Sequence, residues 1–371
     1  MQNTEKELIV KTSAGEIQAD RPAPVTSAFD VVIYKQRMQP QYALDALVEG
    51  YSVLIGDFYS SGLEVLNELK KYVNNKYPDQ SFQGQREARS AYHELSNRIF
   101  LKIVSNRLHV RKAPEIGWLK VLYPGLTEFL LPFPRVQGLN SSWQWYEKGI
   151  FIPVLRTKIH PWYGTYFPTR FEHLEIFENW LKNYRGQKEL AIDVGTGSGV
   201  LTYQMLKHGF AKVCGTDSNP NAIIGIDEYQ DKNQLQSKVH LFHGDLFAGC
   251  GLTSELIIFN PPWLPAVYNP GGIDAAMYYE PDLFPRFFAE AVKHLKPDGR
   301  VVVLFSNLAE FTNPETEHPI KSELENGRRF QKEQFVEKQV RPASKKTKRN
   351  HDRRSDEKVE LWVLKLSGMD M

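Results

Sequence analysis

Beyond residue 170, short apolar runs alternate with segments whose apolar side chains recur at helical spacing. These strand-like runs are residues 189–195, 212–217, 238–245, 255–262 and 300–306. Helical spacing is found at residues 171–184, 200–209 and 284–299. Strands that alternate with helices predict an α/β fold, in which a parallel sheet carries helices on both faces.

The pattern changes after Gly327. Two further strand-like runs, residues 330–342 and 359–366, are separated by a stretch that contains the polar segment Lys345 to Arg354. Two strands joined by a loop predict an antiparallel hairpin at the edge of the sheet.

The first 150 residues have a different pattern. Residues 1 to about 30 are polar and contain Pro22 and Pro24, which predicts a loose arm. Residues from about 40 to 105 predict helices, including one over residues 91–104. Short strands are predicted at residues 107–113 and 117–124. We therefore expect a mostly helical α+β domain over residues 1–150, followed by the α/β domain over residues 151–371.

Composition agrees with two globular domains. The chain has 371 residues, of which 42% are hydrophobic and 12% aromatic, and this excludes a wholly disordered protein. No apolar run approaches the ~20 residues of a membrane helix. The two cysteines are too few for a disulfide framework, and the first residues lack the pattern of a secretory signal. These observations predict a cytoplasmic protein with no membrane association.

Charge is concentrated near the C-terminus. Residues 328–358 hold 12 Lys and Arg against 5 Asp and Glu, although the net charge of the chain is only +2. The segment Lys345 to Arg354 is either a solvated loop or an arm that contacts nucleic-acid phosphates.

A glycine-rich loop begins at the end of the strand-like run over residues 189–195. Gly195, Gly197 and Gly199 form G-x-G-x-G between a predicted strand and a predicted helix, and Asp217 ends the next strand. Glycines allow a sharp turn and a close approach of backbone to a ligand, and the helix start offers free N–H groups. An acidic residue at the end of the second strand is placed to accept hydrogen bonds from ribose hydroxyls. This order of features predicts a site for an adenosine-type ligand.

These residues resemble the first two motifs of the class I S-adenosylmethionine-dependent methyltransferases. The resemblance implies a Rossmann-like seven-stranded sheet and S-adenosylmethionine as cofactor. It implies that Asp217 holds the ribose and that Asp245 and Leu246 meet the adenine, although Asp245 could instead cap the next helix. The remaining cofactor contacts that it implies are Asp193, Gly195, Thr196, Gly197 and Gly199.

The segment 164–174 resembles the part of these enzymes that lies over the methionine end of the cofactor. The resemblance extends to Phe167, Pro168 and Thr169, of which Thr169 is the candidate cofactor contact. Thr169 as an N-cap of the following helix is an equal alternative.

The most specific motif is Asn260-Pro261-Pro262-Trp263, directly after an apolar strand. It resembles the [N/D]-P-P-[Y/F/W] motif of methyltransferases that act on nitrogen conjugated to a planar group. Such a nitrogen is a poor nucleophile because its lone pair is delocalised. The Asn260 side-chain oxygen and the Pro261 carbonyl can each accept one of its N–H groups. Pro262 fixes the backbone, and Trp263 can stack on a flat substrate.

No metal is predicted, because His240 and His243 lie three apart on a strand and face opposite sides. The motif resembles that of the methyltransferase small-domain group, which includes release-factor glutamine methyltransferases and N6-adenine methyltransferases. The substrate is therefore a macromolecule, with a protein glutamine and a base in RNA or DNA as alternatives, RNA being favoured over DNA. A non-catalytic cofactor-binding protein is a third alternative, which the intact motif disfavours.

Overall fold

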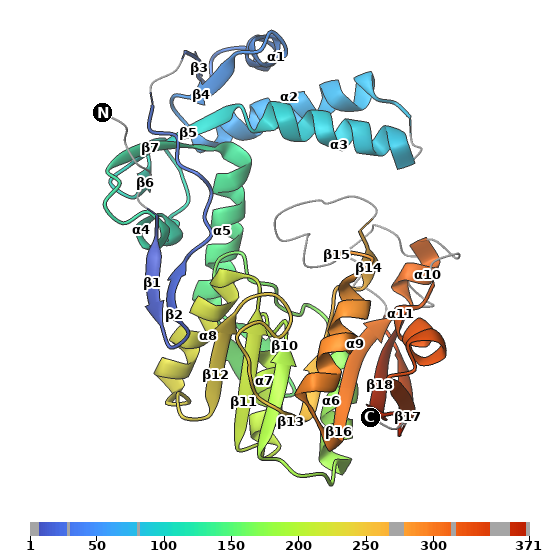
Figure 1. Cartoon of the computed structure of the whole chain (residues 1–371). Coiled ribbons are helices and arrows are strands. Elements are labelled where there is room, and N and C mark those ends of the chain that lie inside the picture. Colours follow the sequence, from blue (N-terminus) through green and yellow to red (C-terminus); the bar gives the residue numbers. More distant parts are fainter. Residues whose placement is uncertain are drawn as a thin grey trace. The chain divides into compact units, whose positions relative to one another are not determined.

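The computed structural model describes residues 7–27, 30–79, 82–266, 278–312, 317–341 and 357–368. It divides into two compact units (Figure 1). One unit comprises residues 1–8 and 19–147, and the other comprises residues 9–18 and 148–371. No helix in the described ranges is both long and apolar enough to cross a membrane.

The larger unit is built on a sheet of seven strands. Their spatial order is β12-β11-β10-β13-β16-β18-β17. The first five strands are mutually parallel, whereas β18 runs antiparallel to both of its neighbours. The strands are β10 (Leu190–Val194), β11 (Lys212–Asp217), β12 (Val239–His243), β13 (Ser254–Phe259), β16 (Leu295–Ser306), β17 (Phe330–Gln339) and β18 (Lys358–Leu366). The predicted seven-stranded sheet and its edge hairpin are confirmed.

Alternate residues of each strand enter two separate apolar cores. Ala191 belongs to one cluster and Ile192 to the other, as the two-residue period of a strand requires. Helices α6 (Glu172–Asn183) and α7 (Val200–Lys207) contribute to the first cluster, and α9 (Leu283–His294) contributes to the second. Both faces of the sheet are therefore buried, which accounts for the continuous apolar runs in its sequence.

Shorter elements complete this unit. They are β8 (Ile150–Ile152), β9 (Thr157–Ile159), α8 (Pro220–Asn233), β14 (Leu264–Pro265), β15 (Tyr278–Tyr279), α10 (Leu308–Thr312), α11 (Pro319–Ser322) and a π-helical turn at Glu323–Gly327.

The expectation of a loose N-terminal arm is wrong for residues 9–18. They form a hairpin of β1 (Ile9–Thr12) and β2 (Gly15–Gln18), which packs on α8. At its turn, the backbone N–H and the hydroxyl of Ser13 donate to Asp227 Oδ1 at 2.9 and 2.5 Å, and Gln230 Nε2 donates to Ser13 Oγ at 2.9 Å. The polar turn residues that suggested a free arm are the ones that bind it to the helix.

The smaller unit is an α+β structure around a five-stranded mixed sheet. Its strands are β3 (Val31–Tyr34), β4 (Ser52–Ile55), β5 (Ile99–Val104), β6 (Arg107–Leu108) and β7 (Glu128–Pro132). Its helices are α1 (Pro40–Val48), α2 (Tyr59–Lys76), α3 (Phe82–Ser96), α4 (Trp118–Leu122) and α5 (Phe133–Lys148).

Several predictions for this unit are wrong. Residues 52–55 form β4 rather than part of a helix, and the strand expected over residues 107–113 ends at Leu108. The helix expected over residues 91–104 ends at Ser96, and β5 follows because its β-branched residues pack in the sheet. Residues 118–122 form helix α4 rather than a strand. Its buried residues Trp118, Leu119 and Leu122 lie on one helical face.

Candidate active site

The glycine-rich loop turns sharply between β10 and α7. Gly195, Gly197 and Gly199 have φ angles of +66°, +54° and +77°, a region that residues with side chains rarely adopt. A Cβ atom on Gly199 would lie 2.8 Å from the ring of Tyr203. The backbone amide of Thr196 anchors the loop to β11 by donating to the Thr216 carbonyl at 2.9 Å. The backbone path itself therefore requires glycine at these three alternate positions.

Asp193 lies fully buried on β10, just before this loop. Its Oδ2 accepts hydrogen bonds from the hydroxyls of Thr196 and Thr202 at 2.9 and 2.7 Å. Its Oδ1 has no hydrogen-bond partner among the described residues. Burial raises the pKa of Asp193 to about 7, against the opposing effect of the two hydroxyls. Asp193 thus keeps one buried acceptor oxygen without a described hydrogen-bond partner.

Asp217 at the end of β11 faces the same loop. Its Oδ2 accepts from the Gly197 amide at 2.7 Å, and its Oδ1 accepts from the Asn219 amide at 2.8 Å. Burial raises the pKa of Asp217, although both amides lower it. Because each carboxylate oxygen accepts more than one hydrogen bond, Asp217 keeps acceptor capacity for a ligand.

Asp245 and Leu246 follow β12. Asp245 forms an ion pair with Arg286 of α9, and its side chain is 59% exposed. Leu246 is buried in the second apolar cluster. Their contact with adenine stays a prediction. His243 is exposed at the end of β12, where its ring nitrogen lies 3.2 Å from the Ser218 carbonyl oxygen.

The segment before α6 lies against the glycine loop and the start of α8. Asn219 and Asn221 donate their side-chain amides to the carbonyls of Gly164 and Tyr163 at 2.9 and 2.8 Å. A Cβ atom on Gly197 would lie 3.4 Å from the Tyr166 carbonyl oxygen. The segment therefore lies against the loop, and its placement over the methionine end of the cofactor stays a prediction.

Thr169 is exposed in a bend ahead of α6. Its alternative role as helix cap is wrong, because the residue at the N-cap position is Phe171 and no side chain caps the helix. Its contact with the cofactor stays a prediction.

The Asn-Pro-Pro-Trp motif emerges beside the glycine loop. Strands β10 and β13 are parallel neighbours, with Val194 paired to Phe259, so Gly195 and Asn260 leave adjacent strands at the same edge. In open α/β sheets ligands bind at this edge. Pro261 is buried, while Asn260 and Trp263 are half-buried.

Trp263 contacts its own motif and both cores. Its Nε1 donates to Asn260 Oδ1 at 3.2 Å. Its ring packs against both apolar clusters and meets the ring of His173 edge to face, with centroids 5.5 Å apart. These contacts were not expected for a residue assigned only to stacking on substrate.

His173 on α6 is the residue that sequence reasoning missed. It is 3% exposed, and burial lowers its pKa to about 4, so it is neutral at physiological pH. Its Nδ1 has no hydrogen-bond partner within the described part of the chain. The signal was present, because His173 lies next to Leu174 on the apolar side of an amphipathic helix.

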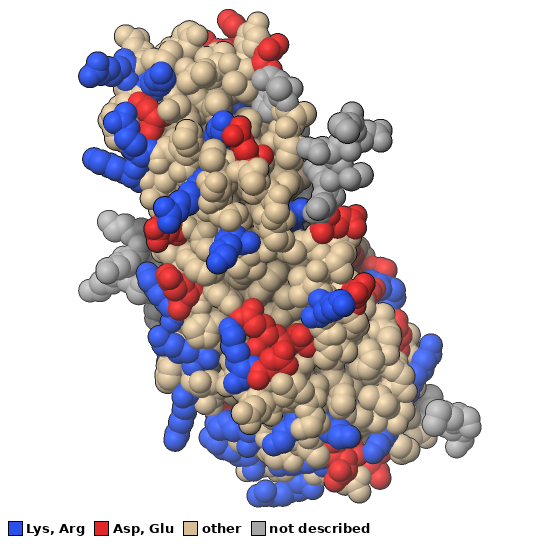
Figure 2. All heavy atoms as spheres, turned by 90° about the vertical axis from the view of Figure 1, so that its left-hand side faces the viewer, with Lys and Arg blue, Asp and Glu red and all other residues tan. Residues whose placement is uncertain are grey.

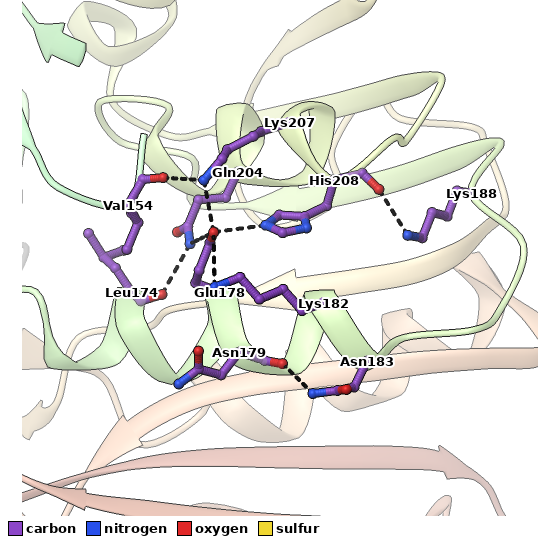
Figure 3. Close-up of polar contacts among 10 residues, drawn as sticks. All are labelled: Val154, Leu174, Glu178, Asn179, Lys182, Asn183, Lys188, Gln204, Lys207 and His208. Atoms are coloured by element: carbon purple, nitrogen blue, oxygen red, sulfur yellow. Dashed lines mark hydrogen bonds and ion pairs between the residues drawn. The ribbon is translucent and has the colours of Figure 1, made fainter. Parts of the chain in front are cut away.

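A polar cluster joins α6 to α7 (Figure 3). Glu178 accepts from Lys207 Nζ at 2.8 Å, and its other oxygen lies 2.8 Å from His208 Nε2. Gln204 Nε2 donates to the Leu174 carbonyl at 3.1 Å. Burial alone would raise the pKa of Glu178, but hydrogen bonds from Lys207 and His208 lower it below its usual value. The helix that carries His173 is thus fixed to the helix that starts at the glycine loop.

The basic segment Lys345 to Arg354 lies outside the described residues, so its predicted contact with phosphates stays a prediction. The space-filling view shows basic and acidic side chains interspersed over the face it presents (Figure 2).

Three features together define a class I S-adenosylmethionine-dependent methyltransferase domain. They are the strand order of the sheet with its five parallel strands, the glycine loop after the first strand and the Asn-Pro-Pro-Trp motif after the fourth. In agreement, residues 175–334 match the family model of the methyltransferase small domain. S-adenosylmethionine is the cofactor of this class. Asp193 Oδ1, which has no hydrogen-bond partner among the described residues, is a candidate acceptor for the positively charged amino group of the cofactor, and this contact stays a prediction.

Three relatives illustrate the similarity. The first, from Methanocaldococcus jannaschii, has the provisional name protein N5-glutamine methyltransferase; it is 29% identical over 43% of this chain and 80% of its own length. The ribosomal protein uL3 glutamine methyltransferase of Neisseria gonorrhoeae is 31% identical over 49% of this chain and 56% of its own length. The ribosomal RNA small subunit methyltransferase C of Alcanivorax borkumensis is 29% identical over 31% of each chain.

Proposed function

We propose that this protein transfers the methyl group of S-adenosylmethionine to the side-chain amide nitrogen of a glutamine in a protein partner. The observation that carries the proposal is the placement of Asn260 beside the glycine loop, on parallel neighbouring strands. The names of the first two relatives, both glutamine methyltransferases, support the choice of substrate. The chain spans about half the length of the second relative, so the substrate is inferred from the shared domain.

The chemistry needs acceptors rather than a strong base. The Asn260 oxygen and the Pro261 carbonyl each take one N–H of the substrate amide, which withdraws the nitrogen lone pair from the amide π system. When bound, S-adenosylmethionine would supply the methyl group from its sulfonium sulfur, and the proton that the substrate nitrogen then loses would pass to solvent. Holding nitrogen and methyl in line can supply ~7–11 kcal/mol of the lowered barrier.

Different residues of the chain would bind different parts of the cofactor. Asp217 is oriented by two backbone amides and would accept from the ribose hydroxyls. Asp193 and the glycine loop would hold the methionine end, with Thr169 above it. Asp245 and Leu246 would meet the adenine.

Methylation of a base in RNA is the second candidate. The segment Lys345 to Arg354 holds six Lys and Arg in ten residues, and one relative has the name of a ribosomal RNA methyltransferase. Such an enzyme would present the same acceptors to an exocyclic amine, and a paired base would first have to leave the helix.

Transfer of tritiated methyl from S-adenosylmethionine to unmethylated cell extract separates the two candidates. We expect the label to be lost on protease treatment and to be recovered as N5-methylglutamine after digestion. Label lost only on nuclease treatment would overturn the glutamine assignment. In that case the quadruple alanine variant of Lys345, Lys346, Lys348 and Arg349 should lose activity, whereas on a protein substrate it should retain it.

A further inference from the structure

The indole of Trp263 touches the amide on which the proposed chemistry depends. Its Nε1–H points to Asn260 Oδ1 at 3.2 Å. A side-chain amide has an acceptor end and a donor end, and an indole N–H is only a donor. The contact is therefore favourable only when the oxygen of Asn260, and not its NH₂ group, faces the indole.

The indole itself is held in place by its surroundings. Trp263 packs against apolar residues of both cores, and the edge-to-face contact with His173 has an interplanar angle of 88°. His173 is buried on α6, which the Glu178 cluster joins to α7. Because the Trp263 indole is packed on several sides, its N–H has a fixed position and can hold the Asn260 amide in one orientation.

We propose that Trp263 is a positioning residue, which uses its indole N–H to fix the Asn260 amide with the oxygen available to the substrate. The oxygen has two lone pairs, so one indole N–H leaves a second lone pair for a substrate N–H. If the amide turned over, its NH₂ group would face the N–H donors of the substrate and would repel them. The inference rests on the proposed function, because it assigns Asn260 as the acceptor.

This role differs from stacking. A stacking platform needs only the flat face of the ring, and its loss weakens substrate binding. A positioning donor needs one N–H group, and its loss slows the transfer step while binding is kept. The two roles therefore predict different responses to removal of the single N–H.

The decisive variant replaces Trp263 by 3-benzothienylalanine, in which sulfur stands where the indole has N–H and the shape is kept. The full-length protein, loaded with tritiated S-adenosylmethionine, is mixed with rising amounts of nuclease-treated unmethylated cell extract. We expect the maximal rate to fall about tenfold, which corresponds to the net free energy of one hydrogen bond. The half-saturating amount of extract should stay unchanged. Cofactor affinity and melting temperature should not change.

A matched control places the same residue at Trp180, whose ring stacks on Phe177 of the same helix and contacts Tyr184 just after the helix ends. This control should transfer methyl at the unsubstituted rate. Trp263→Phe provides a second variant without unnatural chemistry. It should show at least the same fall in maximal rate, together with some loss of stability from the smaller ring.

Two outcomes would overturn the inference. An unchanged maximal rate in the benzothienyl variant would show that the N–H is not needed. A rise in the half-saturating amount alone would identify Trp263 as a stacking surface.

A measurement without substrate separates this inference from the proposed function. In protein labelled with ¹⁵N-indole tryptophan, Asn260→Leu should shift the N–H resonance of Trp263 and speed its exchange with water. An unmoved resonance would overturn the contact. If instead the unsubstituted protein labels no protein in the extract, the proposed function fails while the resonance still tests the contact.

Discussion

The candidate cofactor site at the ends of β10 and β11 consists of backbone groups and the carboxylates of Asp193 and Asp217. At the end of β13, in contrast, the side chain of Asn260 is held by another side chain, that of Trp263. Asp217 is fixed by two backbone amides at 2.7 and 2.8 Å. Asn260 is fixed by the Trp263 indole at 3.2 Å. The cofactor half is thus built into the path of the chain, and the substrate half depends on the orientation of a single amide.

The difference separates two kinds of sensitivity. Changes in the cofactor half should alter binding and stability together, because the same groups serve the turn and the ligand. Changes in the substrate half should alter the rate of transfer and leave the fold intact.

Asn260→Ala should give the largest effect. Loss of the acceptor oxygen should lower the rate of methyl transfer ~100- to 1000-fold, as removal of a preorganised polar group at a reacting centre does. The cofactor affinity, measured by calorimetry, should stay within about threefold because Asn260 lies on the other half. An active variant would contradict the mechanism, and a variant that no longer binds cofactor would contradict the separation.

Asp217→Ala should weaken cofactor binding by ~10- to 100-fold in calorimetry, since it removes an ionised acceptor for ribose hydroxyls. It should also lower the melting temperature, because the Gly197 and Asn219 amides lose their acceptor. Asp245→Ala is the comparison, and its exposed carboxylate paired with Arg286 should matter only a few-fold. Equal losses in both variants would refute the ribose assignment.

Glu178→Gln tests the polar cluster that joins α6, which carries His173, to α7, which starts at the glycine loop. The side chain of Glu178 is 9% exposed and meets both Lys207 and His208, so loss of its charge should lower the free energy of unfolding in urea by about 2 kcal/mol. Because the pKa of Glu178 is lowered in the folded state, this stabilisation is present above about pH 4.3 and disappears as the pH falls below it.

Lys182→Ala is the control for that variant. Lys182 lies 3.8 Å from Glu178 with 58% of its side chain exposed, so the change should cost no more than about 0.5 kcal/mol. A loss as large as that of Glu178→Gln would mean that the cluster acts through exposed charge.

Asp193 should make stability depend on pH in the opposite direction. Its pKa of about 7 in the folded protein exceeds the value of about 3.9 for an unfolded chain, so the folded state holds more protons between these values. The free energy of unfolding should therefore fall as the pH rises from about 4 to about 7, by at most about 1.4 kcal/mol per pH unit. Asp193→Asn should remove this slope, and parallel curves for both proteins would exclude a buried, titrating Asp193.

The sheet was predictable where its residues are buried on both faces. Runs such as residues 256–259 are apolar and buried throughout, and their alternation with helices leaves little choice of architecture. The N-terminal unit was harder because its strands are short and adjoin helices. Ile99 follows α3 so closely that the apolar spacing of one element continues into the next.

The site was predictable to the level of its motifs. The glycines, Asp217 and Asn260 are read from their order along the chain, because each follows a strand whose end lies at one edge. The contact between His173 and Trp263 was not readable, since it joins an upstream helix to a distant loop by packing alone. The Trp263 bond to Asn260 depends on a side-chain orientation that spacing does not specify.

The β1–β2 hairpin makes residues 19–147 an insertion within the larger unit rather than a domain in front of it. Residues 9–18 belong to one compact body with residues 148–371, although more than a hundred residues separate them in the chain. A fragment cut at residue 148 would leave α8 without the hairpin that binds Asp227 and Gln230. A minimal fragment of the larger unit must therefore keep residues 9–18 together with residues 148–371, which would leave the intervening module as a separately replaceable part.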